Sequence, residues 1–266
     1  MSPTPQPELV QYSVEDRIAT ITLNRPEKLN AFTDDSVFQL AAIFRQFDVD
    51  PDADVAVIRG AGRAFSSGAD VLQRQLRPRE ELVKYGSPQA WGAQANELLV
   101  RATNWKPIIS AVHGYAIGMG LGLILETELI VAEEGTKFQV TETSRGLAPV
   151  RYWALMNQRG GGSFAIEATI TGRFFTAEEA LAAGVIDRVA RQGEYLQVAY
   201  DLARQVGQNP PLSVRAAVRA RRWYMEQAER EAYLQTAPLK LHLTEDFHES
   251  AKAFAEKRKA GPFKGR

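Results

Sequence analysis

Residues 107–125 read PIISAVHGYAIGMGLGLIL, and this stretch decides the fold. Its apolar start, from Ile108 to Val112, predicts a buried strand. The glycines that follow predict a tight turn and then a short helix packed closely against its surroundings. The stretch approaches the length of a membrane span, but its glycines and the glutamates that follow at 126 and 128 favour a buried strand and helix. We therefore expect no membrane span.

The same order of strand, turn and helix recurs on both sides of this stretch. Further strands are expected at residues 18–23, 55–58, 129–132 and 185–189. Thr176 and Glu179 have the spacing of a capping box that starts a helix. Alternation of this kind predicts an α/β architecture.

Beyond residue 194 the pattern becomes helical. Helices are expected at residues 195–207, 212–230 and 245–259, and a further helix from Ser87 to Trp105. We expect an α/β core over residues 1–194, with a disordered arm at 1–8, and a helical C-terminal region over residues 195–266.

The composition excludes several classes of site. The 32 basic and 32 acidic side chains give a formal net charge of zero, so the chain lacks the electrostatic footprint of a general nucleic-acid binder. The absence of cysteine excludes disulfides, thiolate nucleophiles and zinc–thiolate sites. With three histidines, a multi-His metal site is not expected. Carboxylates, hydroxyls, basic side chains and backbone groups are left to carry the chemistry.

Two glycine-rich turns, at residues 64–70 and 114–122, each lie between a strand and a helix. Helix starts present unpaired N–H groups and the positive end of the helix dipole. Two such starts that converge could hold a developing oxyanion between two backbone donors. Neither turn matches a phosphate loop or a dinucleotide-binding fingerprint. The alternative is that the glycines serve only tight packing.

Six segments along the chain carry the pattern of one family. They are NRPEKLN at 24–30, GRAFSSGAD at 62–70, KPIISAVHGYA at 106–116, the segment 138–149, LAAGVIDRV at 181–189 and FAEKRK at 254–259. Through them the chain resembles the crotonase superfamily, the enoyl-CoA hydratase/isomerase family, over nearly its whole length. The resemblance implies a crotonase-type spiral of strand-strand-helix repeats, a C-terminal helical trimerisation region and acyl-CoA thioester substrates.

The resemblance also implies binding residues. The oxyanion donors fall on the backbone N–H groups of Ala69 and Met119. Lys28 and Leu29 follow the family position that touches CoA. Asp70 lies beside the first donor, although an Asp there also suits a helix cap. Lys257 belongs to a basic tail that could meet a CoA phosphate, or could be a solvated terminal helix.

The carboxylates decide the reaction. Hydratases of this family hold one water between two glutamates; the resemblance places one of them at Glu142, whereas the position of the other holds Gly122. Glu142 is therefore the candidate for a single general base. Glu126 and Glu128 are expected to be structural or solvated charges rather than replacements.

Tyr152 and Trp153 depart from the small residues that the family has after Pro149. They would reshape the acyl pocket, together with Gly122, if they face it. The alternative is a helix with both aromatic rings in the core. Arg145 and Arg151 could lie near Glu142, or could be surface charges.

These observations favour enoyl-CoA double-bond isomerisation, which needs an oxyanion hole and one base. The alternatives are an enoyl-CoA hydratase with an atypical water site, a cyclic β-keto acyl-CoA hydrolase and a non-catalytic acyl-CoA binding protein. We expect no metal or redox cofactor, no nucleic-acid partner and a cytoplasmic location. A homotrimer or homohexamer is expected, because the family assembles through its helical region and an apolar face lies at Val198, Leu202 and Val206.

Overall fold

The computed structural model describes residues 8–85 and 105–266. All but the last residue of the expected N-terminal arm lies outside the described residues. The helix expected from Ser87 to Trp105 lies outside them as well, apart from its last residue.

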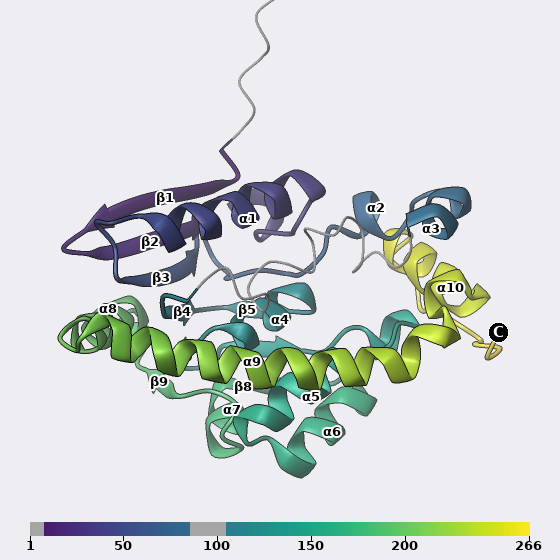
Figure 1. Ribbon diagram of the computed structural model, residues 1–266. Coiled ribbons are helices and arrows are strands. Elements are labelled where there is room, and N and C mark those ends of the chain that lie inside the picture. Colours follow the sequence, from purple (N-terminus) through teal and green to yellow (C-terminus); the bar gives the residue numbers. More distant parts are fainter. Residues whose placement is uncertain (1–7, 86–104) are drawn as a thin grey trace, which may run out of the picture.

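A six-stranded sheet runs through the body of the molecule (Figure 1). Its strands, in sheet order, are β1 (Val10–Glu15), β2 (Ile18–Leu23), β3 (Val55–Gly60), β4 (Ile108–Val112), β6 (Leu129–Glu133) and β9 (Arg188–Ala190). β1 and β2 form an antiparallel hairpin, and the remaining neighbours pair in parallel. The α/β class expected from the alternating pattern is confirmed.

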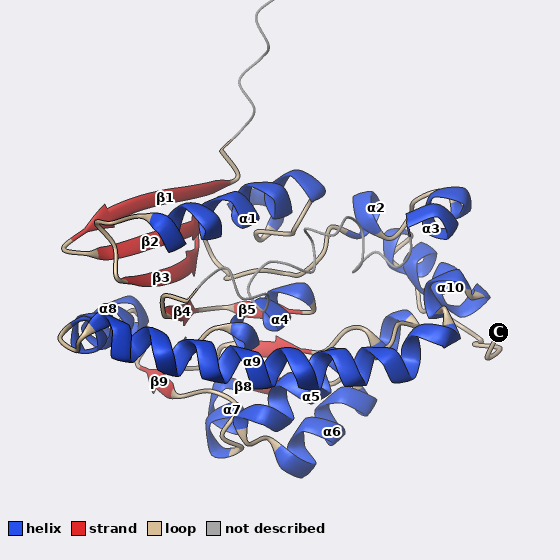
Figure 2. Ribbon diagram, viewed as in Figure 1, coloured by secondary structure: helices blue, strands red, loops and turns tan. Residues whose placement is uncertain are grey.

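A second, smaller sheet follows the chain out of β4. It contains β5 (Tyr115–Ile117), β7 (Lys137–Gln139) and β8 (Phe174–Thr176), with β7 in the middle. The labels β5 and β8 mark two of these strands in Figure 2. The helix α4 (Met119–Glu126) begins two residues after β5, as the glycine-rich stretch predicts. The second sheet therefore fixes where α4 starts.

Helices cover both faces of the large sheet, because its strands alternate in the face they present. In β3, Ala56 and Ile58 pack in the same cluster as Phe44 of α1 (Asp34–Val49). Val55 and Val57 face the other way and pack with the buried side chains of α8 (Tyr195–Gly207). This two-sided burial explains why the parallel strands read as continuous apolar runs.

The face of α8 that we expected to serve assembly has a different role. Leu202 is buried in the cluster that α8 forms with the large sheet, and Val198 and Val206 pack against the same cluster. The prediction that these residues form an oligomer face is therefore wrong, because the sheet of the same chain covers them.

The remaining helices are α2 (Val71–Arg74), α3 (Arg79–Tyr85), α5 (Val150–Arg159), α6 (Gly162–Thr171), α7 (Ala177–Ala182), α9 (Pro211–Thr236) and α10 (Glu245–Ala255). The capping box of Thr176 and Glu179 is present at the start of α7. The long helix α9 crosses the body from α8 at one end to the neighbourhood of α10 at the other (Figure 1). No helix in the described ranges is both long and apolar enough to cross a membrane.

The strand expected at 185–189 lies later in the chain. Val185 and Ile186 are buried next to α7, where both N–H groups donate to the Ala180 carbonyl. Pairing with β6 begins only at Arg188. The apolar pair predicts a strand there because burial in a turn and burial in a sheet leave the same pattern in the sequence.

Candidate active site

The two glycine-rich turns meet in space. Ala69 pairs with Phe32 in one isolated bridge, and Ser66 pairs with Ala116 in another, so the first turn is pinned against the start of the second sheet. Gly68 has φ +91°, and a Cβ there would lie 2.7 Å from the Ile117 carbonyl oxygen and 3.4 Å from the Met119 nitrogen. Glycine is thus required at 68 for the turns to approach.

The approach brings the Ala69 and Met119 amides to one place. Among the residues that the structure describes, neither N–H donates to a backbone carbonyl, and Gly118, the N-cap of α4, provides no side chain to cap the helix. The positive end of the α4 dipole lies at Met119. This geometry suits a site for a developing oxyanion.

Glu142 lies against the second of these turns. It follows β7, begins the 3₁₀ turn η3 (Thr143–Arg145) and is 6% exposed. A Cβ on Gly118 would lie 3.7 Å from Glu142 Oε1, so the carboxylate reaches the residue before Met119. The Thr141 hydroxyl donates to Oε2 at 3.5 Å. A buried carboxylate therefore lies beside the candidate donors.

Glu142 has a polar neighbour on α5, Tyr152. Its hydroxyl donates a hydrogen bond to Glu142, and its side chain is 1% exposed. Burial, and then the Glu142 charge, raise the pKa of Tyr152 well above its ordinary value. Trp153, one residue on, is 38% exposed. The two aromatic residues therefore do not share one role: Tyr152 is buried and contacts Glu142, whereas the Trp153 ring lies at the surface.

Gly122 leaves a space that α5 fills. A Cβ on Gly122 would lie 3.3 Å from Arg151 Nη1, 3.3 Å from Tyr152 Cε1 and 3.5 Å from the Tyr152 hydroxyl. The position where the family resemblance implies a second glutamate is thus occupied, from the opposite helix, by a phenol and a guanidinium.

Glu126 is a structural charge, which is one of the two roles expected for it. It lies one helical turn after Gly122 on the same face of α4, is 2% exposed and forms an ion pair with Arg151. Arg151 Nε also bonds Glu229 of α9 at 2.7 Å. The spacing of 122 and 126 indicates that Glu126 shares a face of α4 with Gly122, but it does not reveal the partner on α5.

Glu128, in contrast, is structural as expected. Its two oxygens accept from the guanidinium of Arg222, at 2.9 Å from Nε and 2.7 Å from Nη2, and from the Ile108 amide at 2.9 Å. The carboxylate therefore joins α9 to the start of β4.

The candidate CoA residues come from three separate segments of the chain. The Leu29 carbonyl accepts from the Ser67 amide at 2.9 Å, which places the segment of Lys28 and Leu29 beside the first turn. Asp70 caps α2 by accepting from the Gln73 amide. Lys257 follows α10, and among the described residues no hydrogen bond or ion pair joins it to Lys28, Leu29 or Asp70.

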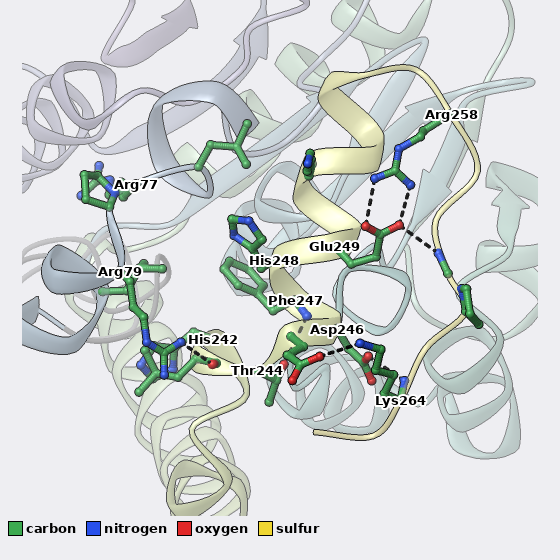
Figure 3. Close-up of a pocket in the computed structure, with 18 residues that line it drawn as sticks. Arg77, Arg79, His242, Thr244, Asp246, Phe247, His248, Glu249, Arg258 and Lys264 are labelled. Carbon is green, nitrogen blue, oxygen red and sulfur yellow. Dashed lines mark hydrogen bonds and ion pairs between the residues drawn. The ribbon is translucent and has the colours of Figure 1, made fainter.

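A cavity of about 940 Å³ lies between α3 and α10 (Figure 3). Its apolar wall includes Leu82 and Phe247, which cluster with Leu147. The Leu147 amide donates to the Glu142 carbonyl, so this wall lies close to the turn that begins at Glu142. The cavity was not predicted, because its two sides come from distant parts of the chain.

No set of three acidic or histidine side chains within 8–85 and 105–266 is arranged to hold a metal ion.

Comparison with known proteins gives one consistent result. A family model described as "Enoyl-CoA hydratase/isomerase" matches residues 13–266. The chain is 32% identical to a mevalonyl-coenzyme A hydratase of Aspergillus fumigatus, over 97% of this chain and 95% of that one. It is 33% identical to a 2,3-dehydroadipyl-CoA hydratase of Escherichia coli, over 96% and 98%. The solved structure of a carnitinyl-CoA dehydratase from Mycobacterium avium matches with a TM-score of 0.78 and 28% identity, over 95% and 98% of the two chains.

Proposed function

The chain belongs to the enoyl-CoA hydratase/isomerase family and has its crotonase fold, and from this premise we propose that it moves a carbon–carbon double bond in an enoyl-CoA thioester with Glu142 as the single base. It is an acyl-CoA enzyme of that family. One observation carries the proposal of isomerisation: among the described residues, a buried carboxylate lies beside two amides that donate to no backbone carbonyl, and the position of the second glutamate is filled by Tyr152 and Arg151.

The proposed reaction needs one base and no water. Glu142 takes a proton from carbon 2 of a 3-enoyl thioester, and the electron pair of that C–H bond is delocalised onto the thioester oxygen as a dienolate. The amides of Ala69 and Met119 stabilise this oxyanion. Glu142 then returns the proton to carbon 4, which gives the conjugated 2-enoyl thioester.

The proposal is tested by supplying 3-hexenoyl-CoA and following formation of the conjugated product by absorbance. A folded protein that binds acyl-CoA but forms no conjugated product would exclude isomerisation.

Hydration is the second candidate function, and the relatives favour it. Two of the similar proteins named above are hydratases and one is a dehydratase. Of the two positions where the family has water-holding glutamates, only Glu142 carries a carboxylate in this chain. Glu142 would therefore activate the added water, with the Tyr152 hydroxyl as a neighbouring hydrogen-bond donor.

We expect the protein to bind acetoacetyl-CoA with no dependence on a metal. Within the part of the chain that the structure describes, the site presents backbone amides and a single carboxylate, which is too few ligands to hold a metal ion. Isothermal calorimetry with and without a chelator checks this, and loss of binding on chelation would contradict it.

We propose a trimer or a dimer of trimers. The apolar face of α8 is covered, but α9 leaves large side chains more than half exposed at Leu212, Trp223, Tyr224, Tyr233 and Leu234. Burial of such a surface between copies removes apolar area from water. Light scattering is expected to give the mass of three or six copies, whereas a stable monomer at micromolar concentration would refute the assembly.

A further inference from the structure

We propose that Tyr152 is the positioning residue of Glu142: its hydroxyl takes over, from α5, the place of the missing second carboxylate and holds the base beside the Met119 amide. The inference rests on the proposed role of Glu142 as the base. It adds a residue whose function neither the family match nor the resemblance assigns.

The geometry has three parts. The Tyr152 hydroxyl donates to Glu142, and Tyr152 is almost completely buried. The ring and the hydroxyl lie against Gly122, at contact distance from where a Cβ would be. Glu142 in turn reaches Gly118, the residue before the Met119 donor. Gly122 therefore makes room for the phenol, and the phenol limits where the carboxylate can lie.

Arg151 is adjacent but is held by other groups. Its guanidinium bonds Glu126 of α4 and Glu229 of α9, so two carboxylates compensate its charge. Tyr152, in contrast, donates its hydroxyl proton to a hydrogen bond with Glu142.

Other charges also act on this pair. Arg145 of η3 interacts electrostatically with Glu142, and Arg151 and Glu229 interact with Tyr152. Arg145 is itself fixed, since its guanidinium stacks 3.9 Å from the Phe254 ring centre and donates to the Ser250 carbonyl. These groups remain in place when only the Tyr152 hydroxyl is removed, so a change of one oxygen isolates its effect.

The chemical consequence follows from the direction of the hydrogen bond. Because Tyr152 keeps its proton, it acts as a donor and cannot serve as a second base. A donor to the ionised carboxylate favours that form. Tyr152 therefore keeps Glu142 ionised and oriented, which is the state a base needs before it takes a proton.

Tyr152→Phe tests this role. We expect the acid limb of the kcat/KM profile for 3-hexenoyl-CoA to move to higher pH, because the carboxylate loses its donor. On that limb the loss of kcat/KM should be roughly tenfold or more, the effect of one hydrogen bond to a charged group. The loss should appear in kcat, with KM little changed, since the hydroxyl is bonded to the base rather than to substrate.

Tyr12→Phe is the matched control. Tyr12 also donates to a carboxylate, at 2.8 Å to Asp50, but it lies on β1 away from the turns. This variant should leave the pH profile unchanged. An equal fall in activity for both variants at every pH, with no shift of the acid limb for Tyr152→Phe, would overturn the proposal.

A second readout separates this proposal from the proposed function. The titration of the Glu142 carboxyl can be followed by ¹³C NMR of protein labelled at the glutamate carboxyls, with Glu142→Gln to assign the signal. We expect Tyr152→Phe to raise the pKa of Glu142 whether or not the protein isomerises any substrate. An unchanged titration would refute the role of Tyr152. Failure of the wild type to turn over 3-hexenoyl-CoA would refute the isomerisation alone.

Discussion

Glu142→Gln should lose most isomerase activity while it keeps acyl-CoA binding. The amide is nearly isosteric with the carboxylate and still accepts a hydrogen bond from Tyr152, but it cannot take a proton. Loss of general-base catalysis should lower kcat by on the order of 10²–10⁴. The rate of 3-hexenoyl-CoA conversion measures the first effect, and calorimetry with acetoacetyl-CoA measures the second.

Glu15→Gln provides the control for this prediction. Glu15 is exposed at the end of β1, so its replacement should change neither rate nor binding. If Glu142→Gln binds ligand and retains a rate within about threefold of wild type, well below the range expected for a lost base, another group takes the proton.

Glu128→Ala should cause the largest loss of stability. Arg222 is 3% exposed, and Glu128 accepts two hydrogen bonds from it. Removal of the carboxylate leaves the guanidinium buried without that compensation, which typically costs about 3–5 kcal/mol. The free energy of unfolding in urea, measured with the thermal midpoint, checks this.

Glu231→Ala is the matched change on the surface of α9. Glu231 is exposed, so its loss should change the free energy of unfolding by no more than about 0.5 kcal/mol. A similar small loss for Glu128→Ala would mean that Glu128 contributes no more than a surface charge.

Local patterns in the sequence predicted the frame of the site well. The apolar run at 108–112 and the glycines after it gave β4 and the start of α4, because burial on both faces and close approach each restrict residue type strongly. Asp70 was expected as a helix cap and is one. Such features depend on neighbours in the chain, so they can be read from it.

Contacts between distant segments were predicted poorly. The ion pair of Glu126 joins α4 to α5, and the apolar face of α8 meets strands far away in the chain. A charged residue near a helix end and an apolar stripe on a helix have the same appearance whether their partner is solvent, another copy or the same chain. Tyr152 is the clearest case. The sequence indicates that a bulky ring lies at this position, but the hydrogen bond of Tyr152 to Glu142 depends on how α5 packs on α4.

The most direct test of a one-base site is a comparison of two reactions on the wild-type protein. Conversion of 3-hexenoyl-CoA to the conjugated 2-enoyl product and hydration of crotonyl-CoA are measured at the same enzyme concentration and pH. Isomerisation with much slower hydration is predicted, because Tyr152 and Arg151 occupy the position of the second water-holding carboxylate. Rapid hydration without isomerisation would contradict the account and would identify the protein as a hydratase.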